Sequence, residues 1–125
     1  MTAIREANNL GDVLKYEAPN LYSRDRVTVA SGQTLALGSV VGVVTATGKV
    51  KALDPAATDG TEVAYGVLAG EIDAALADRE DAILIARHAI VASGALVWPD
   101  GITLTQKAAA IAQLQERGVL VRISA

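Results

Sequence analysis

Short runs of β-branched and other aliphatic residues, separated by glycine-containing turns, make up most of the chain after residue 25. Residues 26–30 alternate between apolar and polar side chains, which is the period-two pattern of a half-buried strand. Segments 39–44 and 49–53 flank Thr-Ala-Thr-Gly and predict a hairpin in which Gly48 takes a positive φ. Further strands are predicted over 62–72, over 82–87 with an irregular continuation to 91, and over 119–123. We interpret "SGQTLALGS" as a turn-rich link and 73–81 as a loop or a short helical turn.

The segment 103–117 is the one convincing helix. Thr103 and Gln106 have the spacing of a capping box, in which each side chain bonds the backbone amide of the other. Gly118 stands where a left-handed C-cap belongs. The face expected to pack on the sheet holds Leu104, Ala108, Ile111 and Leu114. The pattern as a whole predicts a mainly β fold with one C-terminal α-helix.

Residues 1–24 differ from the rest because they are polar, mixed in charge and without helical periodicity. "ANNLGD" and "APN" are turn or loop signals, whereas Leu14, Tyr16 and Ala18 alternate with charged residues as an extended strand does. Two interpretations stay open: a disordered terminus, or an arm that orders by adding a strand to the exposed edge of a partner's sheet. We divide the chain into a flexible N-terminal arm, residues 1–24, and a β-rich domain, residues 25–125.

Composition indicates one small domain with an aliphatic core. The chain has 125 residues, of which 51% are hydrophobic but only 3% aromatic, and it contains no Cys and no Phe. The core must therefore be built from Ala, Val, Leu and Ile, and disulfides or Cys-ligated metals are excluded. The N-terminus lacks the apolar core of a signal peptide, and no apolar run reaches the ~18 residues of a membrane span. We expect synthesis in the cytoplasm and no membrane partner.

Acidic residues concentrate in the middle of the chain. The net charge is −3 at pH 7, and eight acids accompany a single Arg between residues 54 and 81: Asp54, Asp59, Glu62, Glu71, Asp73, Asp78, Glu80 and Asp81. Such a segment faces water, on the outside of an assembly for example, or a basic partner. A nucleic-acid partner is not expected, because there is no basic stripe with interleaved aromatic residues.

No catalytic or metal-binding constellation can be drawn from the sequence. His88 is the only histidine, so it has neither a second His for a metal pair nor a Cys to activate. No serine lies in a G-x-S-x-G elbow, the glycines do not form a phosphate-binding loop, and the acids lack the spacing of a calcium loop. We therefore predict no enzyme, no catalytic residue and no cofactor. A carboxylate-dependent hydrolase on the acidic loops remains the weakest alternative.

Trp98, the only tryptophan, allows two interpretations. It can be a core residue whose indole N–H finds a backbone partner. The other interpretation is an anchor at a protein interface, where Trp is enriched among hot spots.

Three stretches, in this order, resemble the head decoration protein family of tailed bacteriophages: "VTVASGQ" with "LGSVVGVVTATGK", "LDPAATDGTEVAYGVL", and "LVWPDGIT" with its Ala-rich helix. The resemblance runs from about Asn9 to Arg122. It implies a small, mainly β fold of the β-clip type, and an arm that is flexible when free and orders on the capsid. It also implies a structural protein that binds the major capsid protein on the outside of the expanded shell, as trimers at three-fold and quasi-three-fold sites. There it stabilises the virion head against packaged DNA.

The resemblance and the strand-like alternation together give candidate contact residues. We expect the arm to bind the capsid through Arg5, Leu10, Val13, Leu14, Tyr16, Leu21 and Tyr22, and the trimer interface to include Trp98 and Pro99. One alternative stays open, because "VASGQTLALGSVVGVVTATGKVKAL" has the rhythm of biotinyl and lipoyl carrier domains. Those domains present a lysine at a hairpin tip, which here is Lys49, although the flanking residues of their motifs are missing.

Overall fold

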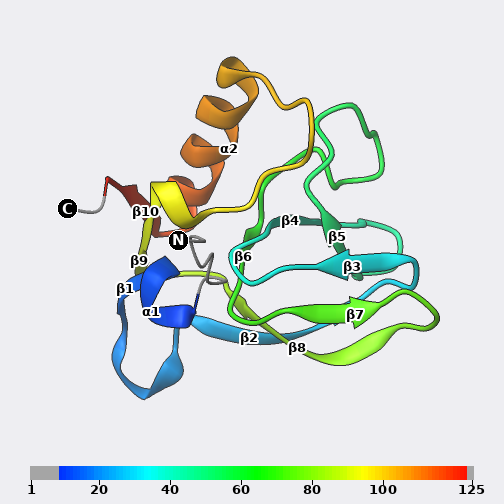
Figure 1. Ribbon diagram of the computed structural model, residues 1–125, viewed down its shortest axis with the longest axis horizontal. Coiled ribbons are helices and arrows are strands. Elements are labelled where there is room, and N and C mark those ends of the chain that lie inside the picture. The colour runs from blue at the N-terminus through cyan, green and yellow to red at the C-terminus, as the bar shows by residue number, and fades with distance from the viewer. Residues whose placement is uncertain (1–8, 124–125) are drawn as a thin grey trace, which may run out of the picture.

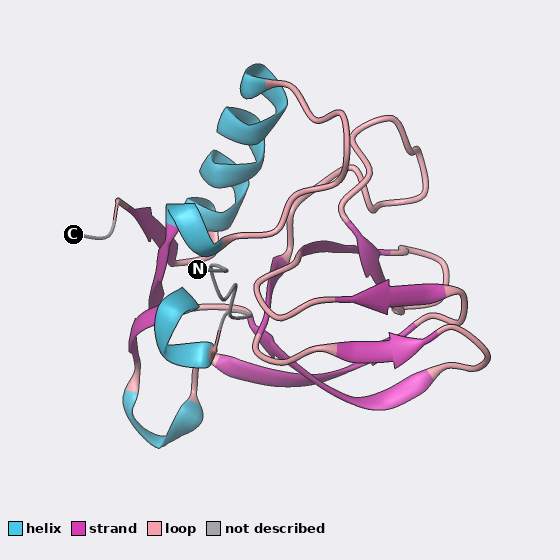
Figure 2. Ribbon diagram, viewed as in Figure 1, coloured by secondary structure: helices cyan, strands magenta, loops and turns pink. Residues whose placement is uncertain are grey.

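The computed structural model describes residues 9–123 and is mainly β, as the sequence predicts (Figures 1 and 2). It contains a closed five-stranded barrel, a three-stranded sheet and a two-stranded sheet. The helical segments are α1 (Leu10–Val13), η1 (Pro19–Leu21), η2 (Ser93–Ala95) and α2 (Leu104–Glu116), η1 and η2 being 3₁₀ turns. The strands are β1 (Leu14–Glu17), β2 (Arg24–Val29), β3 (Gln33–Leu35), β4 (Val40–Val43), β5 (Val50–Ala52), β6 (Gly66–Leu68), β7 (Ile72–Ala74), β8 (Arg79–Ile85), β9 (Ala89–Ala92) and β10 (Val119–Arg122).

The barrel joins its strands in the order β2-β5-β4-β6-β8, and antiparallel pairing of β2 with β8 closes it. The predicted hairpin is confirmed as β4 and β5. Its turn is closed by a hydrogen bond of 2.8 Å from the amide of Val44 to the carbonyl of Lys49, and Gly48 has a φ of 73°. Glycine takes this left-handed conformation at little cost. The small sheet of β3 and β7 lies beside the barrel (Figure 1).

Alternate residues of the barrel strands contribute to two separate apolar clusters. Val40 and Val67 belong to the cluster shared with α2 and the three-stranded sheet, whereas Val41 and Leu68 belong to the cluster shared with β3 and β7. This division follows from the strand geometry, because successive side chains point to opposite faces. All buried hydrophobic residues in the described part of the chain are Ala, Val, Leu or Ile, which confirms the predicted aliphatic core.

Strand β9 is the centre of the three-stranded sheet, with β1 antiparallel on one side and β10 parallel on the other. Only residues 86–88 separate β8 of the barrel from β9. Within this short connection His88 has a φ of 49°, a left-handed conformation that interrupts the extended chain. The predicted irregular continuation of one strand is therefore a turn followed by a new strand.

Helix α2 begins and ends where the sequence predicts. The hydroxyl of Thr103 accepts from the amide of Gln106 at 3.1 Å, and the Gln106 side chain accepts from the amide of Thr103 at 2.9 Å. Gly118 has a φ of 86°, as a left-handed C-cap requires. The capping-box and C-cap predictions are both confirmed.

The buried face of α2 differs from the predicted one. Ala110 and Leu114 are buried, whereas Leu104 is 83% exposed and Ala108 is also exposed. The reason lies in the placement of the helix. Its C-terminal half lies against β10, while its first turns project beyond the sheet (Figure 1). A periodicity shows which side of a helix is apolar, but not how far along the helix the sheet extends.

The strands of the small sheet were predicted wrongly. Residues 33–35, interpreted as part of a link, form β3, and 73–81 contains the end of β7 and the start of β8 instead of a loop or helical turn. Of the strand expected over 62–72, only residues 66–68 form one (β6). Residue 72, the last of that range, is the first residue of β7. β3 and β7 have three residues each and pair with one another, so they depend on a long-range partner more than on local preference.

At Gly42, β4 lies in close contact with the loop that joins β5 to β6, so a larger residue does not fit there. A Cβ on Gly42 would lie 2.6 Å from the Cα of Thr61, which is backbone and cannot rotate away. We expect Gly42→Ala to lower the free energy of unfolding by about 2 kcal/mol or more, as overpacking of a core does. Urea denaturation measures it. Gly94→Ala is the matched control, because nothing lies within 4 Å of its Cβ, and its effect should stay within about 0.5 kcal/mol. Equal effects of the two substitutions would contradict this account of the contact.

Candidate functional site: surfaces for protein contacts

The N-terminal segment from residue 9 lies on the domain. Asn9 and Asp12 form a reciprocal capping box at the start of α1: the Asn9 side chain accepts from the amide of Asp12 at 3.1 Å, and the Asp12 carboxylate accepts from the amide of Asn9 at 2.9 Å. This short helix places the side chain of Val13 in the core, where it is fully buried. The sequence of this segment predicts only a turn, although Asn9 and Asp12 have the spacing of a capping box.

The predicted strand around Tyr16 is confirmed as β1, and its partner is the protein's own β9. Leu14 pairs with Val91 and Tyr16 with Ile90, with a bulge between the two pairs. β1 is an edge strand, so its other side faces away from the sheet. That an arm over residues 1–24 orders on a capsid stays a prediction.

Two ion pairs hold the turn that follows β1. Glu17 accepts two hydrogen bonds from the guanidinium of Arg24, at 2.6 and 2.9 Å, and a third from the hydroxyl of Ser23 at 2.7 Å. Asp25 accepts two from Arg87 at 2.6 and 2.8 Å. Arg87 also donates to the carbonyl of Tyr22 at 2.9 Å. Bidentate contacts of this kind, between an arginine and a carboxylate, fix the orientation of both side chains better than a single hydrogen bond does.

These contacts keep both acids charged. The hydrogen bond from Arg24 is the main cause that lowers the pKa of Glu17, and the hydrogen bond from Arg87 lowers the pKa of Asp25. Burial opposes both shifts and is the weaker effect. Chain segments 17–25 and 87 are thereby tied together at neutral pH.

Exposed apolar and aromatic side chains gather over this turn. Tyr16, Leu21 and Tyr22 are 57%, 58% and 57% exposed, and the His88 ring meets Tyr22 edge to face with 5.1 Å between ring centres. With Pro19 these residues form what we call the end patch. A groove of about 430 Å³ beside it is lined by Tyr16, Ala18, Pro19, His88, Ala89, Ile90, Gly118 and Leu120.

Backbone strain coincides with the end patch. Leu21 and His88 have φ values of 57° and 49°, and among the described residues they are the two non-glycine positions with positive φ. Such conformations cost of order 1–3 kcal/mol and concentrate at functional surfaces. Strain, exposure and aromatic content therefore coincide at the same end of the molecule.

The structure brings together some of the predicted contact residues and separates others. Tyr16, Leu21 and Tyr22 share the end patch, whereas Leu10 in α1 and Leu14 in β1 are half-buried. Val13 is in the core, so in this conformation it contacts the domain. Arg5 lies outside the described residues. The contribution of His88 was missed, because a lone histidine in the sequence gives no sign that its ring packs on Tyr22.

Trp98 and Pro99 lie on a different surface, between η2 and α2. Both are half-buried; Trp98 packs against the cluster under α2, and the ammonium of Lys107 lies 6.0 Å from its ring centre. Trp98 therefore has one side in the core and one side on the surface. Pro99 borders a groove of about 510 Å³ between residues 51–61 and 99–106.

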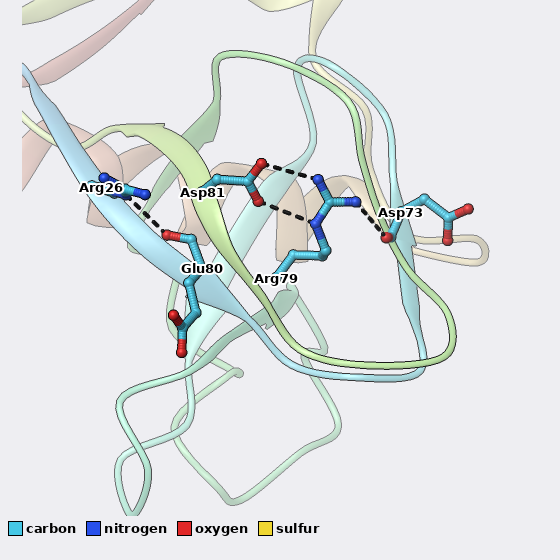
Figure 3. Close-up of polar contacts among 5 residues, drawn as sticks. All are labelled: Arg26, Asp73, Arg79, Glu80 and Asp81. Atoms are coloured by element: carbon cyan, nitrogen blue, oxygen red, sulfur yellow. Dashed lines mark hydrogen bonds and ion pairs between the residues drawn. The ribbon is translucent and has the colours of Figure 1, made fainter.

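The acidic segment faces solvent, as predicted, and carries its own ion pairs (Figure 3). The guanidinium of Arg79 binds both carboxylate oxygens of Asp81, at 3.1 and 3.0 Å, and the carbonyl of Asp73 at 3.3 Å. Lys49 pairs with Asp78 at 2.6 Å, so it does not extend freely from the hairpin tip as a carrier lysine would. No group of three or more ligating side chains suited to a metal ion occurs within residues 9–123.

The fold and these surfaces define a small β domain that exposes apolar and aromatic side chains at one end. The sequence matches the family model for the bacteriophage lambda head decoration protein D over residues 3–119. The chain therefore belongs to this family of phage head decoration proteins, whose place is on the capsid of the virion. Among proteins with curated descriptions, none matches the chain. No helix described here is both long and apolar enough to cross a membrane.

The two ion pairs make the stability of the terminal turn dependent on pH. The pKa values of Glu17 and Asp25 lie below their ordinary values of 4.5 and 3.8 in the folded state. A carboxylate whose pKa is lower in the folded than in the unfolded state stabilises the fold when the pH lies above its unfolded pKa. As the pH falls from about 5 through the folded pKa, the carboxylate is protonated and this stabilisation is lost. We expect Glu17→Gln and Asp25→Asn to lower the urea midpoint at pH 7 and to differ less from wild type at pH 2–3. Asp100→Asn, at a residue without an ion pair in the described chain, should show no such convergence. A difference that stays constant with pH would contradict the ion-pair account.

Proposed function

We propose that the protein adds to the outside of the expanded phage head as trimers, at three-fold and quasi-three-fold positions, and stabilises the shell against the pressure of packaged DNA. It performs no enzymatic step, and it meets the shell in the host cytoplasm during assembly. Membership of the head decoration family is the single observation that carries this proposal. Its direct partner is the major capsid protein.

The end patch supports a contact with that partner. Exposed Tyr side chains are typical anchors of protein interfaces, because they supply a large contact area with few rotatable bonds. The turn that presents them is already fixed by Arg24 and Arg87. Little conformational entropy is therefore lost when a partner covers Tyr16, Leu21 and Tyr22.

The sheet edge beside the end patch suits strand addition. β1 is the outer strand of the sheet β1-β9-β10, so a capsid strand can extend this sheet without displacing β1 from β9. The segment before residue 9, with Arg5, would continue along the capsid from there. Of the predicted arm, residues 9–24 lie on the domain, and the capsid contact proposed for Arg5 lies outside the described residues.

A trimer would bind the shell tightly even if a single copy binds it weakly. Once one subunit of a trimer is bound, the others bind at a high effective concentration, which raises the overall affinity by 10²–10⁴. Trp98 and Pro99 are the proposed contact between copies, because they are partly exposed on a surface distinct from the end patch. The exposed side of an otherwise core-packed Trp98 is the part that a neighbouring copy would cover.

The central test is co-sedimentation with cognate capsid shells, unexpanded and expanded. We expect binding to expanded shells only, reduced at least tenfold by deletion of residues 2–8 and by the double substitution Tyr16→Ala with Tyr22→Ala. Deletion of residues 2–22 is less informative, because it also removes the core side chain of Val13. Leu104→Ala is the control for loss of exposed apolar area: Leu104 is 83% exposed at the start of α2, at the far end of the molecule from η1 (Figure 1). Absence of wild-type binding to both shells would refute the proposed function.

The trimer contact has its own test. Pro99→Lys places a charge on the proposed interface without removing Trp98 from the core, and it should abolish the trimer band after chemical crosslinking of shell-bound protein. Trp98→Ala should do the same. Gln115→Ala, on the exposed side of α2, should leave the band unchanged. If Pro99→Lys protein crosslinks as wild type does, the interface lies elsewhere.

A further inference from the structure

A single left-handed residue precedes the central strand of the three-stranded sheet. His88 has a φ of 49°, lies directly before β9 and is exposed. Glycine adopts this conformation at little cost, whereas a residue with a Cβ is strained there. Because the exposed imidazole adds little apolar burial, a glycine would make the less strained turn at this position. What the histidine adds is therefore found in the contacts of its side chain.

The turn at His88 brings two consecutive side chains onto one ring. In an extended strand, successive side chains point to opposite faces. Here the guanidinium carbon of Arg87 lies 5.4 Å from the ring centre of Tyr22, and the ring of His88 lies 5.1 Å from it at an interplanar angle of 62°. These are the distances of a cation–π contact and of an edge-to-face aromatic pair. The positive φ interrupts the extended chain at this point, so both side chains reach Tyr22.

Hydrogen bonds from the same turn hold the chain before, at and after Tyr22. The carbonyl of His88 accepts from the amide of Ala18 at 3.0 Å. Arg87 donates to the carbonyl of Tyr22 at 2.9 Å, and it binds both carboxylate oxygens of Asp25 at 2.8 and 2.6 Å. The backbone on either side of Tyr22 is therefore tied to residues 87 and 88, and the position of its ring follows that of the turn.

The rings of His88 and Tyr22 differ in what surrounds them. The imidazole lies against the backbone after α2, because a Cβ on Gly118 would be only 3.1 Å from the Cδ2 of His88. Tyr22 belongs to neither of the two apolar clusters and is 57% exposed. Within the described chain, contacts with Arg87 and His88 therefore orient the tyrosine ring in place of core packing. More than half of the residue stays free for a partner.

We propose that the left-handed turn at His88 positions Tyr22 for binding to the capsid shell, with Arg87 and His88 as its positioning residues. This inference rests on the proposed function, and it names the residues that prepare the shell contact. A tyrosine that is held in one orientation before it meets the shell loses less conformational entropy on binding. The strain at His88 thus serves binding and opposes folding, so stability and shell binding place opposite demands on residue 88.

His88→Gly in the full-length protein separates these two demands. Glycine keeps the left-handed turn and relieves its strain, but it removes the ring that contacts Tyr22. We expect the thermal unfolding midpoint to equal that of wild type or to rise. In co-sedimentation with expanded shells, half-saturation should require at least about threefold more protein, because a freed side chain must be ordered again on binding. A role in folding alone would lower the unfolding midpoint instead.

A double-mutant cycle tests whether His88 acts through Tyr22. If it does, adding His88→Gly to Tyr22→Ala should weaken shell binding no further than Tyr22→Ala alone. Arg87→Lys keeps the positive charge but loses the planar group that binds Asp25 and contacts the ring. It should lower the unfolding midpoint, and its effect on shell binding should also disappear when Tyr22 is alanine.

Thr58→Gly is the matched control for the glycine substitution. Thr58 is exposed in the loop between β5 and β6, and its φ is not positive. Glycine therefore relieves no strain there. This variant should bind shells as wild type does, and its unfolding midpoint should not rise.

The outcomes separate this proposal from the proposed function. If wild type binds expanded shells and His88→Gly binds equally well, the positioning role is wrong and the proposed function stands. A lower unfolding midpoint of His88→Gly also overturns the positioning role, because the histidine would then serve the fold. Effects of His88→Gly and Tyr22→Ala that multiply overturn it too, since His88 would then act independently of Tyr22. If wild type does not bind, the proposed function fails and the positioning role fails with it.

Discussion

The pairing of β9 with β1 on one side and β10 on the other is the interaction on which the rest of the structure depends. β9 follows β8 after three residues, 86–88, so the sheet that holds both ends of the chain is tied directly to the barrel. The N-terminal segment joins this sheet through β1, and α2 joins it through β10. Because Ala89 and Val91 are buried, the same strand also supplies core contacts. The end patch exists only because this arrangement places η1 beside the turn at His88.

The arrangement also accounts for how a protein with so few aromatic residues can hold rigid surfaces. Its core is aliphatic and divided into two clusters by the alternation of the barrel strands. The surfaces are fixed by charged contacts instead: Arg24 and Arg87 hold the end patch, and Arg79 links Asp73 of β7 to Asp81 of β8. Each of these arginines binds a carboxylate through two nitrogen atoms. Such geometry orders a turn that has little apolar area to bury.

Sequence reasoning succeeded where the signal was local. The hairpin around Gly48 and the caps at Thr103 and Gly118 follow from a few adjacent residues with definite backbone requirements. Prediction failed for elements whose structure depends on a partner far away in the sequence. β3 becomes a strand only because Gln33 pairs with Ala74, and the helix face is set by where β10 ends.

The candidate surfaces show the same division. The alternation around Tyr16 predicted a strand, but no local pattern showed that this strand would pair with β9 of its own domain. The sequence predicted Val13 to be a capsid contact in the arm. The short helix α1, which the reciprocal cap begins, instead directs its side chain into the core. The ring contact between Tyr22 and His88 joins positions far apart in the chain, so the sequence alone could not predict it.

Membership of the decoration family and the exposed end patch lead to one central claim, that the protein binds the outside of the expanded head. The most direct measurement is a cryo-electron microscopy reconstruction of expanded cognate shells with and without the added protein. The account predicts additional density outside the shell at three-fold and quasi-three-fold positions, with the end patch of each copy touching the shell. Shells that show no additional density, or density only on the inner surface, would contradict it.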